Sequence, residues 1–296
     1  MPSAVSGSPA PRRSTGIPIR EALDSAVIPL RAARVDTPRL DAEVLLAAAM
    51  GVDRAALYRD PDAELPGDAV RPFQAMVLRR RKREPVAYIV GSKGFRRLEV
   101  AVDPRVIVPR PETELLVEVA LGLPQGARVL DLGTGSGAVA LALKDERPDL
   151  DVTASDVSRR ALEVAQANAE RLGLDVAFAQ SHLLDGVSGA VDAVVSNPPY
   201  VADAQRALLA PEITRHEPAL GLFAGPDGLE LIRDLVPAAA ARAPWLALEL
   251  GAGQADALCD RIRIKPAKPP PEVRDCPIRA CSEELLRNGH RPHGFR

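Results

Sequence analysis

The sequence predicts a doubly wound α/β domain, preceded by a small all-helical domain and joined to it by a β-hairpin. The first third of the chain repeats its apolar residues at helical spacing, a short segment then alternates, and residues 127–251 alternate strand and helix patterns. A length of 296 residues gives room for two hydrophobic cores. The expected architecture is therefore two domains with a hairpin linker between them.

Residues 1–16 are rich in Pro, Ser, Gly and Arg and have no periodicity, so we expect a disordered leader. From Ile19 onward, apolar residues recur every three or four positions, which predicts a helix. A second helix is expected to begin at Thr37-Pro38, where Thr caps and Pro fits the first turn, and to stop at Gly51. A third short helix is expected over residues 53–58.

A fourth helix, with Val70, Phe73 and Val77 on one face, ends in the basic run 79–83 and completes a helical domain over residues 17–84. The basic run has two interpretations. It can be a solvated helix end, where cations stabilise the negative end of the helix dipole. It can also be a contact for an anionic partner.

The linker is expected over residues 85–112. Within residues 95–109 the apolar positions alternate on both sides of Val102-Asp103-Pro104, which predicts a hairpin turning at that point. A new helix is expected from Arg110-Pro111 to Leu121.

The second domain is expected over residues 113–258. Short apolar runs alternate with helical patterns, and this alternation is typical of a parallel sheet covered on both faces. The expected strands are 127–133, 151–156, 176–180, 191–197 and 246–251, and the expected helices between them are 138–144, 159–172 and 227–241.

A glycine loop follows the first of these strands and opens a helix. Glycine at every second position lets the backbone turn sharply and approach a ligand closely. Asp156 ends the next strand, where a carboxylate can accept hydrogen bonds from both ribose hydroxyls of a bound nucleoside. The loop also satisfies the dinucleotide fingerprint, so it does not identify the cofactor by itself. The loop residues are Gly133, Thr134, Gly135, Ser136 and Gly137.

The sequence Asn197-Pro198-Pro199-Tyr200 follows the strand 191–197, at the edge where doubly wound sheets bind ligands. The prolines lack N–H groups, which leaves carbonyl oxygens free to accept. The Asn197 side-chain oxygen and the Pro198 carbonyl can each accept a hydrogen from an amide or amino nitrogen about to be methylated. Tyr200 can lie on the flat face of that group, so positioning and electrostatics supply most of the catalysis.

These residues resemble the class I S-adenosylmethionine-dependent methyltransferases, whose sheet is Rossmann-like. More narrowly, the chain resembles the release factor glutamine methyltransferase (PrmC/HemK) family from about residue 18 to residue 257. The specific markers are the segments 84–91, 106–114 and 215–218, together with Phe95 and the helical N-terminal domain.

The resemblance implies that S-adenosylmethionine is the cofactor and that the glutamine of the Gly-Gly-Gln motif in peptide chain release factors is methylated on its side-chain amide. It implies cofactor contacts at 133–137, Asp156, His182, Leu183 and Asn197. Residues 197–200 would hold the glutamine, with Asn197, Pro198 and Tyr200 as the catalytic residues. The helical domain would dock the release factor. Family members usually have an acid and often an aromatic residue where this chain has His182 and Leu183, so weaker cofactor binding is expected; His182 can also be simply packed or solvated.

Residues 259–296 differ from the family pattern, which continues with a helix and two strands. They hold three prolines in a row and all three cysteines, so we expect a poorly ordered, replaced or frame-shifted tail that leaves a sheet edge exposed. The spacings of its Cys and His residues match no standard zinc pattern, and no metal is expected.

Charge and composition limit the partners. With 38 basic and 40 acidic residues the net charge is −2, so neither a nucleic-acid clamp nor direct nucleic-acid binding is expected. No apolar run approaches the roughly 20 residues of a membrane span, and three cysteines fit a reducing compartment, so a cytoplasmic protein without membrane contact is expected. Two alternatives stay open: a methyltransferase acting on amino groups of nucleic-acid bases, and a catalytically impaired release-factor binder with an altered C-terminus.

Overall fold

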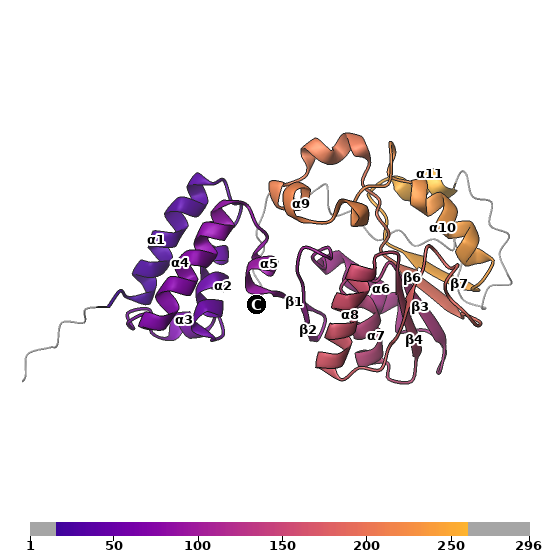
Figure 1. Cartoon of the computed structure of the whole chain (residues 1–296), viewed down its shortest axis with the longest axis horizontal. Coiled ribbons are helices and arrows are strands. Elements are labelled where there is room, and N and C mark those ends of the chain that lie inside the picture. The colour runs from indigo at the N-terminus through magenta and orange to yellow at the C-terminus, as the bar shows by residue number, and fades with distance from the viewer. Residues whose placement is uncertain (1–15, 260–296) are drawn as a thin grey trace, which may run out of the picture. The chain divides into compact units, whose positions relative to one another are not determined.

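The computed structural model describes residues 16–259, and the chain divides into two compact units (Figure 1). The first unit ends at Val90 and the second begins at Gly91. Each unit has its own hydrophobic core and is described by itself.

The first unit is a bundle of helices, as its apolar spacing predicts. Its core combines buried side chains of all five helices of this unit, among them Leu30, Leu45 and Phe73. The second helix has Pro38 in its first turn and ends at Gly51, whose φ of +64° is the left-handed conformation that glycine adopts at low cost. The helices are α1 (Ile19–Ala32), α2 (Pro38–Met50), α3 (Ala56–Arg59), α4 (Gly67–Arg81) and α5 (Val86–Val90).

The basic run at the end of α4 is partly used inside this unit. The ion pair between Arg80 and Asp41 is buried, with 2.6 Å between Nε and Oδ2. Arg81 and Lys82 are exposed. Three arginines bind groups of the same unit: Arg79 binds Glu84, Arg80 binds Asp41 and Arg83 donates to the carbonyl oxygen of Ala33. Most of this run therefore stabilises the bundle.

The hairpin exists, but the predicted position of its turn is wrong. Strands β1 (Ser92–Phe95) and β2 (Leu98–Ala101) pair antiparallel around Arg96 and Arg97. A turn does form at Asp103-Pro104, since the Val106 amide donates to the Asp103 carbonyl, but it joins no paired strands. The Asp103 carboxylate binds the backbone and the guanidinium of Arg105 instead, which holds this segment in an irregular conformation.

The second unit contains a five-stranded parallel sheet, as predicted. Its strands are β3 (Arg128–Leu132), β4 (Asp151–Asp156), β5 (Ala177–Gln180), β6 (Ala193–Ser196) and β7 (Trp245–Leu248). Their order is β5-β4-β3-β6-β7, so the chain winds outward from β3 in one direction and then returns to start again beside it at β6. The carboxyl ends of β3 and β6 thus flank the topological switch point, where ligands bind in sheets of this kind.

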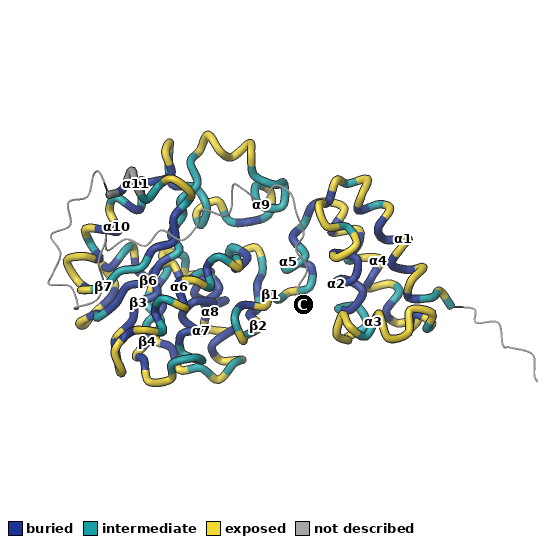
Figure 2. Tube along the Cα trace, turned by 180° about the vertical axis from the view of Figure 1, so that it is seen from behind, coloured by how far each residue is buried: buried dark blue, intermediate teal, exposed yellow. Residues whose placement is uncertain are grey.

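Helices cover the sheet on both faces, which explains why nearly every residue of the central strands β3 and β6 is buried. Leu130 and Leu132 of β3 pack in a core cluster with Ile232 and Leu235, whereas Asp131 between them points to the opposite face. Figure 2 shows the central strands as buried, and every residue of β6 is buried. The helices are α6 (Glu114–Ala120), α7 (Ala138–Glu146), α8 (Arg159–Leu172), α10 (Glu230–Ala240) and α11 (Gln254–Cys259).

Several short elements complete the unit. The 3₁₀ turn η1 (Pro111–Thr113) leads into α6. The segment between β6 and α10 carries η2 (Asp203–Leu208), α9 (Pro211–His216) and η3 (Ala219–Gly221).

The unusual tail expected over residues 259–296 lies outside the described residues, apart from Cys259 at the end of α11. The expected leader lies outside them as well, except for Gly16. Among residues 16–259, no helix is both long enough and apolar enough to cross a bilayer.

Candidate active site

A cavity of about 420 Å³ lies at the switch point of the sheet. Its size falls in the range of small-molecule and cofactor sites. Segments far apart in the sequence meet around it, including the linker, the glycine loop, the end of β4 and the loop after β6. Of the site residues predicted from sequence, the cavity is lined by Gly133, Gly135, Asp156, His182, Leu183, Asn197 and Pro199.

Two glycines of the loop form an open wall of this cavity. Gly133 and Gly135 have φ values of +76° and +56°, and a Cβ at either position would meet no protein atom within 4 Å. A ligand can therefore occupy the space next to this backbone that a Cβ atom would fill in any other residue. The conformation and the free space both fit a bound cofactor.

The other loop residues support the loop rather than line the cavity. Thr134 is buried, and its hydroxyl donates to Oδ2 of Asp131 at 2.6 Å. The same oxygen accepts from the Ala140 amide at 3.1 Å, near the start of α7. Asp131 is 2% exposed, and burial raises its pKa to about 6 despite these two hydrogen bonds.

Asp156 holds the loop from the end of β4. Its Oδ2 accepts from the Gly135 amide at 3.0 Å and its Oδ1 from the Ser158 amide at 2.8 Å. Burial raises the pKa of this carboxyl group, whereas these backbone hydrogen bonds lower it. Each carboxylate oxygen keeps acceptor capacity, so the group can bind the two neighbouring hydroxyls of a ribose.

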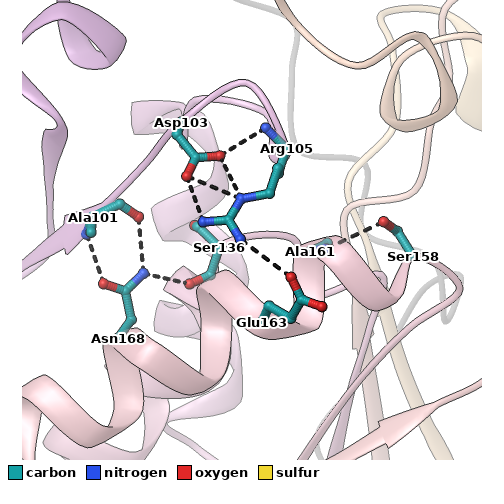
Figure 3. A network of polar contacts seen from close by, with 8 residues as sticks. All are labelled: Ala101, Asp103, Arg105, Ser136, Ser158, Ala161, Glu163 and Asn168. Atoms are coloured by element: carbon teal, nitrogen blue, oxygen red, sulfur yellow. Dashed lines mark hydrogen bonds and ion pairs between the residues drawn. The ribbon is translucent and has the colours of Figure 1, made fainter.

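Asn168 of α8 joins the linker to the glycine loop, and sequence reasoning missed it (Figure 3). Its side chain accepts from the Ala101 amide at 2.7 Å and donates to the Ala101 carbonyl at 2.9 Å. Its Nδ2 also donates to the Ser136 carbonyl at 3.0 Å. One fully buried amide thus fixes β2 against the loop. No local pattern distinguishes this asparagine from the other polar residues of the helix.

The linker also contributes lining residues that the sequence did not indicate. Arg105, Val106 and Ile107 border the cavity. Figure 3 shows the guanidinium of Arg105 between Asp103 and Glu163 of α8. It binds Asp103 at 2.7 Å and approaches Glu163 at 3.4 Å, which ties this part of the linker to α8.

His182 and Leu183 lie where the resemblance places the adenine. Both line the cavity, and Leu183 has a φ of +50°, an uncommon conformation for a residue with a branched side chain. The neighbouring Ser181 stabilises this turn, since its hydroxyl donates to the Leu183 carbonyl at 2.6 Å and accepts from the Gly186 amide at 3.0 Å.

Asn197 follows β6 directly and lines the same cavity. Its Nδ2 donates to Oγ1 of Thr113 at 3.0 Å. Within the described part of the chain, no hydrogen bond reaches the Asn197 side-chain oxygen or the Pro198 carbonyl. Two acceptors are therefore available in this loop. Pro198 itself is buried and does not line the cavity.

Tyr200 points its hydroxyl at the end of β7. The hydroxyl donates to Oε1 of Glu249 at 3.1 Å, and burial together with the Glu249 charge raises the tyrosine pKa. Tyr200 is not among the cavity-lining residues, and its stacking against a substrate stays a prediction. Glu249 is a further residue of this region that sequence reasoning did not single out.

This fold and cavity define a Rossmann-like methyltransferase. The family model described as "Methyltransferase small domain" matches residues 111–218, and the model described as "PrmC N-terminal domain" matches residues 21–91. The sheet order, the glycine loop and the loop after β6 agree with that class.

The chain belongs to the release factor glutamine methyltransferase family. It is 46% identical to the release factor glutamine methyltransferase of Mycolicibacterium smegmatis, over 75% of this chain and 79% of that protein. It is 41% identical to the one of Geobacter sulfurreducens, over 80% of this chain and 86% of that protein. Among solved structures, the catalytic domain of hMettl16 in complex with MAT2A 3'UTR hairpin 1 gives a TM-score of 0.44 at 19% identity, over 65% of this chain and 70% of that one.

Proposed function

We propose that this protein transfers a methyl group from S-adenosylmethionine to the side-chain amide nitrogen of the glutamine in the Gly-Gly-Gln motif of peptide chain release factors. The observation that carries the proposal is that Asn197 and the glycine loop face one cavity. Membership of the family supports the choice of substrate. Release factors act on ribosomes, so the proposed place of action is the cytoplasm.

The cofactor half of the proposal rests on the loop and on Asp156. Gly133 and Gly135 leave room for the methionine part, and Asp156 can accept from both ribose hydroxyls. His182 and Leu183 would flank the adenine. When bound, S-adenosylmethionine supplies a methyl carbon on a positively charged sulfur, which keeps the electron pair of the broken C–S bond.

The substrate half rests on two acceptors. The Asn197 side-chain oxygen and the Pro198 carbonyl would each accept one hydrogen of the glutamine amide. These contacts aim the amide nitrogen at the methyl carbon, and the new N–C bond forms as one N–H proton is lost to water. Holding a weak nucleophile in line in this way can supply a large share of the rate.

The test uses the purified full chain, tritiated methyl donor, and three acceptors: a release factor, its Gln→Ala variant in the Gly-Gly-Gln motif, and total RNA. We expect label only on the unaltered release factor. Label on RNA would support the nucleic-acid alternative and overturn the proposal. Cofactor binding without label on any acceptor would overturn it in favour of the impaired binder.

Asn197→Ala separates the two halves of the site. We expect the variant to lose methyl transfer while cofactor affinity changes little, because Asn197 would act mainly on the substrate amide. Cofactor affinity is measured by calorimetry with S-adenosylhomocysteine. Equal loss of both would argue against the role assigned to Asn197.

A further inference from the structure

Two hydrogen bonds lead from the loop after β6, one to Thr113 and one to the buried carboxylate of Glu249. Asn197 Nδ2 donates to Thr113 Oγ1 at 3.0 Å, and the Tyr200 hydroxyl donates to Glu249 Oε1 at 3.1 Å. Backbone contact holds the same segments together, since the Glu249 amide donates to the Ser196 carbonyl at 3.0 Å. Three separate segments, η1, the loop after β6 and the end of β7, thus meet at one point.

Glu249 is the acceptor of the second bond. The residue is 1% exposed, and burial raises the pKa of its carboxyl group. Hydrogen bonding from the hydroxyls of Thr113 and Tyr200 acts in the opposite direction and lowers it. Among residues 16–259, Oε2 has no hydrogen-bond partner, which leaves this atom as an acceptor for the nearby Thr113 hydroxyl.

The charge of Glu249 would give these contacts a direction. A carboxylate can only accept, so a Thr113 hydroxyl that turns to Oε2 must donate its proton there. The Thr113 oxygen can then only accept from its other neighbour, Asn197. The NH₂ group of Asn197 must therefore face Thr113, and its carbonyl oxygen must face away from Thr113.

Resting on the function proposed above, we infer that Thr113 and Glu249 are positioning residues that fix the orientation of the Asn197 amide. An amide side chain can otherwise turn over, because its oxygen and nitrogen ends have the same shape. A turned Asn197 would present donors to the substrate amide, which also presents donors. The contacts of Thr113 with Asn197 and Glu249, called the relay below, exclude that state. They keep the Asn197 side-chain oxygen facing the substrate as an acceptor.

The first test compares Thr113→Val with Thr113→Ser. Valine keeps the shape of the side chain but removes the hydroxyl, whereas serine keeps the hydroxyl. We expect Thr113→Val to lower kcat about 10- to 100-fold, the loss typical of one hydrogen bond in a catalytic site, with the affinity for S-adenosylhomocysteine within about twofold. Thr113→Ser should restore most of the rate. Equal losses in both variants, or no loss in Thr113→Val, would overturn the inference.

Glu249→Gln tests whether the charge of Glu249 sets which of these groups donate and which accept. The glutamine amide can donate to Thr113 as well as accept from it, so the orientation of Asn197 is no longer imposed. We expect a fall in kcat similar to that of Thr113→Val, and little further loss in the double variant. Additive losses would contradict a shared relay. Thr214→Val is the matched control, because it removes a hydroxyl of α9 that bonds only the Ala210 carbonyl among the described residues.

A measurement independent of activity separates this inference from the proposed function. The side-chain amide protons of Asn197, identified by their absence in Asn197→Asp, should exchange slowly with solvent in nuclear magnetic resonance spectra. Thr113→Val should accelerate that exchange at least about fivefold, the effect expected when a hydrogen bond is removed. Unchanged exchange would overturn the relay. If the exchange result holds but no label reaches release factor, only the proposed substrate fails.

Discussion

Arg110 and Glu217 are 107 residues apart in the sequence and form an ion pair, with 2.5 Å between Nη2 and Oε1. The Glu217 side chain is almost fully buried, and its other oxygen accepts from the Val108 amide at 3.3 Å. Two of the sequence segments that mark the family, 106–114 and 215–218, are therefore in direct contact. This contact holds the linker against the segment between β6 and α10.

Arg110→Met should destabilise the second unit by about 1–3 kcal/mol. Removing one partner leaves a buried charge unpaired, and the partial exposure of Arg110 keeps the loss below that of a fully buried pair. Urea unfolding measures the change. Adding Glu217→Gln should recover part of it, and a fully additive double variant would contradict the explanation. Arg128→Met, which breaks the more exposed pair with Asp192, is the control, with a loss of at most about 1 kcal/mol.

Asp156→Asn should weaken cofactor binding about tenfold or more. The amide replaces one acceptor by a donor, which faces either a backbone N–H group or a ribose hydroxyl. Calorimetry with S-adenosylhomocysteine measures the affinity. His182→Ala, in the same cavity, should cost less than about fivefold, because its expected contact with the adenine is weaker than that of a carboxylate with the ribose hydroxyls. The reverse order of the two losses would show that the ribose assignment is wrong.

Asp131→Asn should change stability in a pH-dependent way. The native pKa is about 6 against an ordinary value of 3.8, so the native state binds this proton more tightly than the unfolded chain. The Asp131 contribution to the free energy of unfolding therefore falls as pH rises through this interval, by up to about 3 kcal/mol. Asparagine keeps an acceptor for Thr134 and Ala140 without a charge.

The measurement is urea unfolding of both proteins at pH 4 and pH 7.5. The variant should gain about 2 kcal/mol relative to the unaltered protein between these two values, because only the aspartate carries the cost of a buried charge at the higher pH. The same difference at both values would mean that Asp131 titrates normally.

Gly137→Ala should be more destabilising than Gly126→Ala. Both glycines have positive φ, +84° and +70°, so both substitutions strain the backbone by about 1 kcal/mol or more. At Gly137 the new Cβ would also lie 3.1 Å from Leu141 and 3.2 Å from Ala165, whereas at Gly126 it meets nothing. Thermal unfolding of the two variants compares them directly. Equal losses would show that α8 moves away at no cost.

The regular elements of the second unit could be predicted because their signals are local. The strand 151–156 and the helix 159–172 begin and end at the expected residues. The hairpin could not be placed as well, because Val102-Asp103-Pro104 and Arg96-Arg97 are both plausible turns. In the folded chain Arg105 binds both Asp103 and Glu163, and the contact with Glu163 spans 58 residues that no local pattern joins.

Only part of the candidate site was predictable for the same reason. The glycine loop, Asp156 and Asn197 follow strands directly, so topology alone brings them to one edge of the sheet. Thr113 was part of a recognised segment, but its contact with Asn197 spans 84 residues and has no local signature. The position of Glu249 after an apolar strand likewise does not predict that it accepts a hydrogen bond from the Tyr200 hydroxyl.

The hydrogen bonds of Asn168 set the shortest piece of this chain that can be expected to fold with its loop intact. A fragment starting at α6, where the strand and helix alternation begins, would lack Ala101 and lose two of the four hydrogen bonds of a fully buried amide. Such a loss costs about 1–3 kcal/mol for each unsatisfied group. Limited proteolysis should therefore spare the hairpin and leave a resistant core that begins near Gly91, ahead of β1. The hairpin looks like a connector in the sequence, but it is needed for the stability of the glycine loop in the second unit.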